Sequence, residues 1–158
     1  MFKNDGKKKS ALEKAYGILA RRPYTEYQIR LKLIKSDYSE QEIDKAISEL
    51  FENHYLDDND YAERYLQILI EKQFGRRRMF DEMRRQGIAP TLAKEIISEG
   101  YSQEHERECA MRVAMRATDG LKEDASFREK ARRISLKLTG KGFDYETIHY
   151  TIDHFPSL

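Results

Sequence analysis

The segment FGRRRMFDEMRRQGI, residues 74–88, concentrates the kind of side chain that is best suited to holding anions. Its five arginines are Arg76, Arg77, Arg78, Arg84 and Arg85. A guanidinium group is planar and always charged, and its N–H donors match the paired oxygens of a phosphate or a carboxylate. Arg77 and Arg78 could instead pair with carboxylates four residues later. The segment therefore predicts a site for an anionic partner, with a locally paired, solvated face as the alternative.

Other residues that could support catalysis or metal binding lie in weak patterns. Residues 57–68, DDNDYAERYLQI, begin like a calcium loop but lack its sixth-position Gly and its twelfth-position Glu. His105 and Cys109 share a helix face, but two ligands do not make a metal site. The sequence has no GxxxxGK[ST] loop and no GxSxG turn. We therefore expect a protein that is not an enzyme and that has no cofactor, no metal and no small-molecule substrate.

The composition indicates a helical protein with a thin core. Charged residues make up 36% of the 158 residues and hydrophobic residues 39%, and the mean hydropathy is −0.83. The net charge is only +1, which argues against a protein that coats DNA through a generally basic surface. The single cysteine, Cys109, excludes an intrachain disulfide. No apolar run approaches the length of a membrane span and the start is polar, so we expect a cytoplasmic protein without a membrane partner.

Helix starts recur along the chain, whereas strand patterns are scarce. Capping-box patterns, in which a small polar side chain and a Glu or Gln three residues later cap each other's amides, are found at Ser10/Glu13, Thr25/Gln28, Ser39/Glu42 and Ser126/Glu129. Asp60 is a further candidate cap, and Pro90 suits the first position of a helix. The predicted helices cover residues 10–22, 25–36, 39–54, 60–73, 75–86, 90–100, 102–118, 126–140 and 144–155.

These helices form a threefold internal repeat. Five apolar positions match at constant offsets of 50 and then 55 residues: Ile29/Met79/Ile134, Leu33/Met83/Leu138, Tyr38/Ile88/Phe143, Ile43/Ala93/Ile148 and Ile47/Ile97/Ile152. Three short helices bury too little surface to be stable alone, but stacked neighbours share a core. We therefore predict an all-α fold of three tandem three-helix repeats, in an elongated, curved array. The predicted parts are a basic, flexible tail at 1–9 and repeats at 10–56, 57–100 and 101–158.

The repeat also separates charges that nearly cancel over the whole chain. The second helices carry three, five and five cations against one, two and one carboxylates, while the third helices of the first and last repeats are acidic. The candidate partner-binding residues on the second helices are the five arginines above together with Arg30, Lys32, Arg132, Arg133 and Lys137. A helix-turn-helix would place the third helix in the major groove, where its carboxylates would be repelled by phosphates. The pattern favours contact through the second helices.

Three segments together resemble the RecX family of bacterial recombination regulators. They are LEKAYGILARRPYTEYQIRLKL, YLDDNDYAERYLQ and FGRRRMFDEMRRQGI, and the resemblance covers residues 11–155. The Gly75–Arg78 segment and the Asp57–Asp58 turn match the family pattern. The first repeat departs from it, with Thr25-Glu26-Tyr27 where the second has Gly75-Arg76-Arg77.

The resemblance implies a regulator built of tandem three-helix repeats that binds the RecA filament. Its expected role is to modulate RecA in DNA repair, recombination and the SOS response, most plausibly by inhibiting its recombinase and ATPase activities. Its cations would engage an acidic RecA groove, DNA phosphates within the filament, or both. The alternatives are a helical module that binds DNA directly without RecA, and an adaptor for an unrelated acidic protein.

Overall fold

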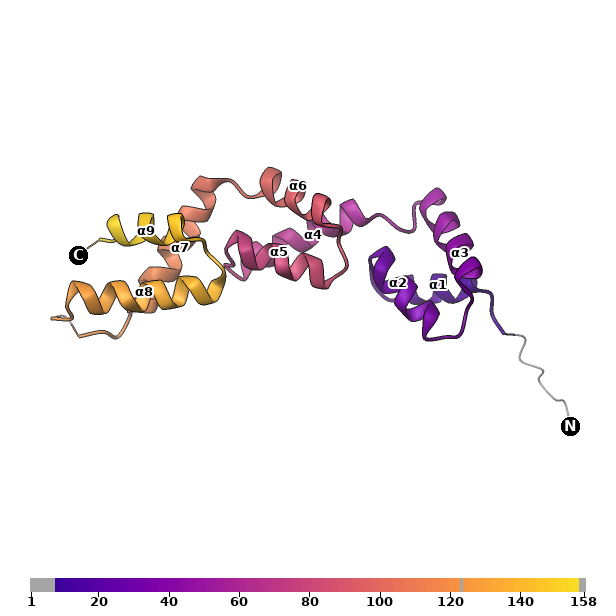
Figure 1. Cartoon of the computed structure of the whole chain (residues 1–158), viewed down its shortest axis with the longest axis horizontal. Coiled ribbons are helices and arrows are strands. Elements are labelled where there is room, and N and C mark those ends of the chain that lie inside the picture. Colours follow the sequence, from indigo (N-terminus) through magenta and orange to yellow (C-terminus); the bar gives the residue numbers. More distant parts are fainter. Residues whose placement is uncertain (1–7, 123, 157–158) are drawn as a thin grey trace, which may run out of the picture. The chain divides into compact units, whose positions relative to one another are not determined.

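The structure is a computed structural model that describes residues 8–122 and 124–156, and within these residues it is entirely α-helical (Figure 1). The helices are α1 (Ala11–Leu19), α2 (Glu26–Ile34), α3 (Glu40–Glu52), α4 (Asp58–Glu71), α5 (Arg76–Arg85), α6 (Pro90–Gly100), α7 (Gln103–Thr118), α8 (Phe127–Lys141) and α9 (Tyr145–Asp153). The all-α prediction is confirmed, and each predicted helix is found within a few residues of its expected ends. The predicted tail at 1–9 lies mostly outside the described residues.

Side-chain caps account for most of the helix starts. The boxes at Ser10, Thr25 and Ser39 are complete, with both reciprocal hydrogen bonds present. Ser126 accepts only the backbone N–H of Glu129. The expectation for Asp60 was wrong, because it is Asp57 whose carboxylate accepts the N–H of Asp60, so α4 begins two residues earlier than predicted. Caps of this kind satisfy amides that have no partner within the helix.

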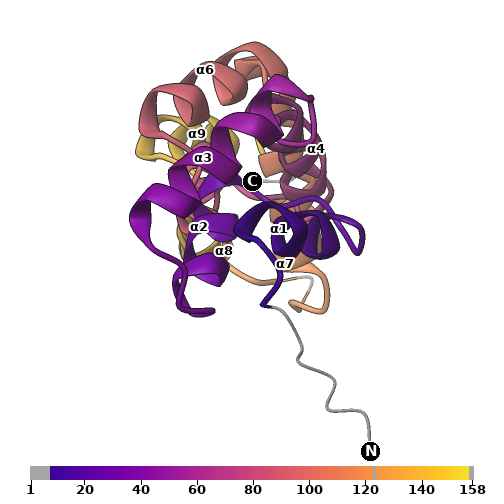
Figure 2. The same cartoon turned by 90° about the vertical axis from the view of Figure 1, so that its right-hand side faces the viewer.

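The chain divides into two compact units. The first, unit 1, consists of the described residues of Met1–Tyr61 together with Gln86–Ile88, and the second, unit 2, of Ala62–Arg85 together with the described part of Ala89–Leu158. In unit 1, α1, α2 and α3 pack against one another around a core that includes Ile29, Leu33 and Leu50 (Figures 1 and 2). The three expected repeat boundaries stay a prediction.

The segment Gln86–Ile88 joins unit 1 through polar contacts at the start of α2. The buried hydroxyl of Thr25 donates to the carbonyl of Gln86 at 2.7 Å, and the side-chain amide of Gln28 donates to the Gln86 side chain at 2.7 Å. Gly87 has φ +85°, and a Cβ built on it would come within 2.4 Å of Tyr27. A glycine is therefore required at this turn.

In unit 2, α7 packs on both α8 and α9, and α5 packs on α6. Its core includes Met79, Met83, Ile134, Leu138 and Phe143, each at most 1% exposed. Of the fifteen residues at the five matched repeat positions, all are buried except Ile152, which is half-buried. The apolar pattern that predicted the repeat is thus the pattern that fills the core of both units.

Candidate partner-binding surface

In unit 2, the helix rich in arginine begins where α8 ends. The N–H of Gly75 donates to the carbonyl of Lys141 at 2.9 Å, and the N–H of Arg77 donates to the carbonyl of Gly142 at 3.2 Å. The first amides of α5 are thus satisfied by the last carbonyls of α8. Cations at a helix N-terminus oppose its dipole, but here the negative end of α8 faces them and offsets that repulsion.

The contact between these two helix ends is made by backbone, because glycines occupy both sides of it. A Cβ built on Gly75 would lie 2.4 Å from the carbonyl oxygen of Gly142. Gly142 itself has φ +82°, and a Cβ there would lie 2.3 Å from the Cβ of Arg78. No larger residue fits either position without moving one of the helices.

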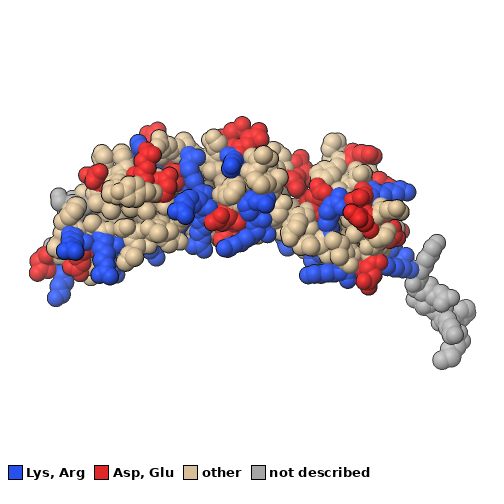
Figure 3. Space-filling view, viewed as in Figure 1, with Lys and Arg blue, Asp and Glu red and all other residues tan. Residues whose placement is uncertain are grey.

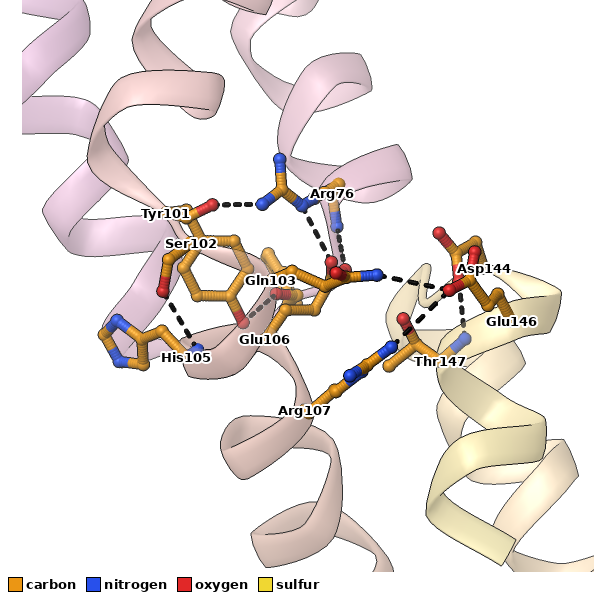
Figure 4. Close-up of polar contacts among 11 residues, drawn as sticks. Arg76, Tyr101, Ser102, Gln103, His105, Glu106, Arg107, Asp144, Glu146 and Thr147 are labelled. Carbon is orange, nitrogen blue, oxygen red and sulfur yellow. Dashed lines mark hydrogen bonds and ion pairs between the residues drawn. The ribbon is translucent and has the colours of Figure 1, made fainter. Parts of the chain in front are cut away.

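Arg76 is held inside unit 2 by a buried carboxylate (Figure 4). Its Nε donates to Glu106 at 2.7 Å and its backbone N–H donates to the same carboxylate at 3.1 Å. The guanidinium also donates to the carbonyl of Tyr101 and lies over the ring of Tyr101. The side chain of Glu106 is only 2% exposed, so this ion pair belongs to the core. Arg76 therefore positions α5 and is unavailable to a partner.

A second cation near the start of α7 is also engaged internally. Arg107 forms an ion pair with Glu146 of α9 at 3.5 Å, and its guanidinium lies 4.1 Å from the ring centre of Tyr150 (Figure 4 shows the ion pair). Gln103 donates to the same Glu146 carboxylate. These contacts tie α7 to α9 and engage the charge of Arg107 within unit 2.

Three more of the predicted site residues have ion-pair partners. Arg30 is bound at 2.7 Å by both Glu26 and Asp44, and these hydrogen bonds raise its pKa above the ordinary value of a guanidinium. Arg78 lies 3.6 Å from Glu82, donates to the carbonyl of Gly140 at 3.2 Å and covers the ring of Phe74. Arg85 lies 3.3 Å from Glu82 but is 71% exposed, so its pair is weak. The charge of Arg30 is the one most fully compensated.

The remaining predicted cations are exposed on the surface. Arg77 on α5 and Arg132, Arg133 and Lys137 on α8 form no ion pair with any described residue. Arg84 on α5 is exposed, and so is Lys32 on α2, whose ammonium lies 5.1 Å from the ring centre of Tyr24. The positive charge that a partner could reach is therefore concentrated in unit 2.

Two hollows in unit 2 gather these cations. The first, of about 300 Å³, is lined by Arg77, Arg78 and Arg85 together with Asp81 and Glu82 and by residues from the end of α8. The second, of about 610 Å³, lies between α7 and α8 and is lined by Arg133 and Lys137 and by Arg116 and Lys141. In Figure 3, Lys and Arg gather over α5 and the adjacent end of α8, with a few carboxylates among them.

The electrostatic effect of this crowding is visible at Lys141. Its ammonium donates to the carbonyl of Lys72 at 2.8 Å. Burial lowers the pKa of Lys141, and the nearby charges of Lys137, Arg78 and Arg116 lower it further. A surface on which cations depress one another's pKa gains most from a polyanionic partner.

Sequence reasoning missed four residues: Gln73, Arg116 and Lys141, which line the α7–α8 side of this surface, and Glu106, which is buried beneath it. A signal for Glu106 exists, since it falls on the apolar stripe of α7 with Cys109, Ala110 and Val113. A carboxylate at such a position indicates a buried ion pair. The other three join the surface only because α8 meets the start of α5, and nothing in their local sequence indicates that contact.

Other kinds of site receive no support from the described part of the chain. There, no group of three or more His, Cys, Asp or Glu residues is placed to hold a metal ion. Nor does any helix of residues 8–122 and 124–156 combine the length and the apolar character needed to cross a bilayer. The structure instead defines an all-α protein with a cationic surface on one unit.

Comparison with known proteins relates the chain to a group of regulatory proteins. Residues 11–50 match the family model described as "RecX, first three-helix domain". The chain is 29% identical to the regulatory protein RecX of Vibrio vulnificus (strain CMCP6), over 90% of this chain and 91% of that protein. It is 28% identical to the regulatory protein RecX of Prosthecochloris aestuarii (strain DSM 271 / SK 413), over 95% and 96%.

Solved structures agree on the fold. The crystal structure of RecX from Lactobacillus salivarius superposes with a TM-score of 0.86 over 94% of this chain and 96% of that chain, at 22% identity. A second crystal structure, of a regulatory protein RecX, gives a TM-score of 0.79 over 91% and 72%, at 21% identity. The chain is therefore similar to regulatory proteins named RecX along nearly its whole length, and it shares the all-α fold of the solved RecX structures.

Proposed function

We propose that this protein modulates RecA by binding the RecA–DNA filament in the cytoplasm. Binding is made mainly through the exposed cations of α5 and α8 in unit 2, and its effect is to inhibit the recombinase and ATPase activities. Similarity to regulatory proteins named RecX supports this role, and the partner is the one that the resemblance of the sequence segments to the RecX family implies. The observation that carries the proposal is the set of cations without internal partners: Arg77, Arg132, Arg133 and Lys137.

The proposal assigns unequal roles to the predicted repeats. Arg30 is compensated by two carboxylates at 2.7 Å, which leaves Lys32 as the exposed candidate cation of α2, whereas α5 and α8 carry the larger number of exposed cations. A binding surface of this kind accelerates encounter with an anionic filament and fixes its orientation. Unit 2, held across neighbouring subunits, then opposes the movements of their ATPase cycle.

The test is RecA ATPase activity on single-stranded DNA with the triple variant Arg77→Ala, Arg133→Ala, Lys137→Ala. Each exposed cation contributes about 0.5–1 kcal/mol, so loss of three weakens binding by roughly 10- to 150-fold. The control is Arg112→Ala, which removes an exposed cation of α7 that lies 4.0 Å from Glu108. We expect the control to inhibit RecA as strongly as the unchanged protein does, and the triple variant to inhibit it more weakly. If the triple variant inhibits RecA undiminished, the cations of α5 and α8 play no part in the mechanism.

Direct binding to DNA without RecA is the second candidate, since the same exposed cations suit phosphates. Binding to bare DNA would weaken steeply as salt rises, because each phosphate contact releases counterions. Weak binding to bare DNA with tight binding to the filament supports the RecA regulator. Equal affinity for both supports the DNA-binding module.

A further inference from the structure

The hollow between α7 and α8, here the α7–α8 hollow, combines positive walls with an apolar surface. Its lining residues are Gln73, Val113, Arg116, Ala117, Arg133, Leu136, Lys137 and Lys141. They include four cations and no carboxylate. Apolar atoms come from the buried Val113, from Ala117 and from Leu136, which is 66% exposed.

The internal contacts of the cations in the α7–α8 hollow are with neutral groups. Arg116 donates to the side-chain oxygen of Gln73 at 2.9 Å, and Lys141 donates to a backbone carbonyl at 2.8 Å. These bonds hold both side chains in place without neutralising them. Arg133 and Lys137, four residues apart on α8, form no ion pair within residues 8–122 and 124–156. The hollow therefore presents fixed, uncompensated charge from two helices.

Leu136 is the feature that a purely electrostatic surface does not explain. It is among the most exposed large apolar side chains described, and it stands between Arg133 and Lys137 in the same lining. Together with Val113 and Ala117 it forms an apolar patch rimmed by cations, and a patch with a polar rim is the arrangement found in contacts between proteins. Single-stranded nucleic acid is held by cations together with aromatic platforms for its bases, and no residue lining the hollow is aromatic.

We propose that the α7–α8 hollow is a docking site for an acidic peptide segment of a partner protein. The segment places an apolar side chain against Leu136, Val113 and Ala117 and its carboxylates on the surrounding cations. A volume of about 610 Å³ accommodates several side chains of such a segment. This mode, an amphipathic segment laid into a groove between helices, is a recurring form of peptide recognition. It deepens the proposed function, because it names the part of the protein partner that unit 2 would grip.

The test measures binding of fluorescent synthetic peptides to the full chain by fluorescence anisotropy. The probe is a short peptide of glutamates around one central leucine. The comparison probes are the same peptide with serine in place of that leucine, and a thymidine oligonucleotide. We expect the leucine peptide to bind most tightly, the serine peptide to bind about fivefold more weakly, and added salt to weaken both.

The variants divide charge from apolar contact. The double variant Arg133→Glu, Lys137→Glu should weaken the leucine peptide by at least about tenfold. Arg128→Glu is its control, because it reverses the charge of one exposed residue of α8 that does not line the hollow, and it should leave affinity unchanged. Leu136→Ser should weaken the leucine peptide by about fivefold and leave the serine peptide unaffected.

Each outcome decides for or against the docking site. The docking site is overturned if the leucine peptide does not bind, or if Arg128→Glu lowers its affinity as much as the double variant does. It is also overturned if the oligonucleotide binds more tightly than the leucine peptide and Leu136→Ser has no effect. Failure of the proposed function is distinguishable: if the unchanged protein has no effect on RecA while the peptide still depends on Leu136, the function falls and the docking site stands. If the unchanged protein inhibits RecA and no peptide binds, the proposed function stands and the docking site falls.

Discussion

Glu106 offers the sharpest test of how unit 2 is held together. Its carboxylate accepts hydrogen bonds from both the side chain and the backbone of Arg76, at 2.7 Å and 3.1 Å. The substitution Glu106→Ala removes both acceptors and leaves a guanidinium without its counter-charge at the start of α5. We expect the loss of stability to be large and confined to unit 2.

The size of the effect follows from the burial of the two partners. Breaking a fully buried ion pair by removing one partner costs about 3–5 kcal/mol. The side chain of Arg76 is 32% exposed, so water recovers part of that cost, and the unsatisfied backbone N–H adds about 1 kcal/mol. The net expectation is about 2–3 kcal/mol. The paired substitution Arg76→Met, Glu106→Met leaves no orphan charge and should recover at least about half of the loss.

Amide hydrogen exchange followed by mass spectrometry is the appropriate assay, because it resolves the two units. Peptides from α5 and α7 should exchange roughly 30- to 150-fold faster in Glu106→Ala, the ratio that corresponds to about 2–3 kcal/mol. Peptides from α1, α2 and α3 serve as the internal control and should not change. Acceleration in α5 below about fivefold, or a double variant as unstable as the sum of its single changes, would refute the assignment of this pair.

Two further predictions concern unfolding by urea, monitored by circular dichroism. Gly142→Ala should destabilise the protein by about 2–4 kcal/mol, because it combines a φ of +82° with a Cβ placed 2.3 Å from the Cβ of Arg78. The matched change Gly17→Ala on α1 meets nothing within 4 Å and should stabilise the protein by about 0.5–1 kcal/mol. Similar effects at both glycines would contradict the close approach of α5 and α8. Asp58 has its pKa raised above 3.8, first by burial and then by repulsion from Glu26, so the stability it contributes is complete below its unfolded pKa and is lost as pH rises through the folded pKa. Asp58→Asn should therefore gain stability relative to the unchanged protein as pH rises from 3.8 upward, and a constant difference across that range would rule out the burial of this carboxyl as the cause.

The local parts of the fold could be predicted from the sequence because they depend on neighbouring residues. The capping boxes at Ser10, Thr25 and Ser39 need only a polar residue and a partner three positions on, and all three formed. The apolar repeat was readable for a similar reason, since a helix must bury one face at a fixed spacing. Asp60 was misassigned because Asp57 and Asp58 offered equivalent side chains, and sequence alone does not rank them.

The candidate site was less predictable because pairing across helices decides which charges are exposed. Arg30 and Arg77 are both cations on second helices, yet Arg30 meets Asp44 of the next helix and Arg77 meets no carboxylate among the residues described. The sequence placed Arg76 near the centre of the surface, whereas in the structure it forms an ion pair with the buried Glu106 and positions α5. The sequence indicates where cations are plentiful, but only the packing shows which of them form ion pairs within the protein.

The glycine contact between the end of α8 and the start of α5 also has a geometrical consequence. Because Gly75 and Gly142 bring the two backbones together without intervening side chains, the exposed charges of α5 and of α8 belong to a single stiff piece. The distances between these charges are therefore fixed by the backbone contact and do not adjust to the surface of a partner. A partner with the same total charge but a different spacing between its anionic groups would therefore bind more weakly.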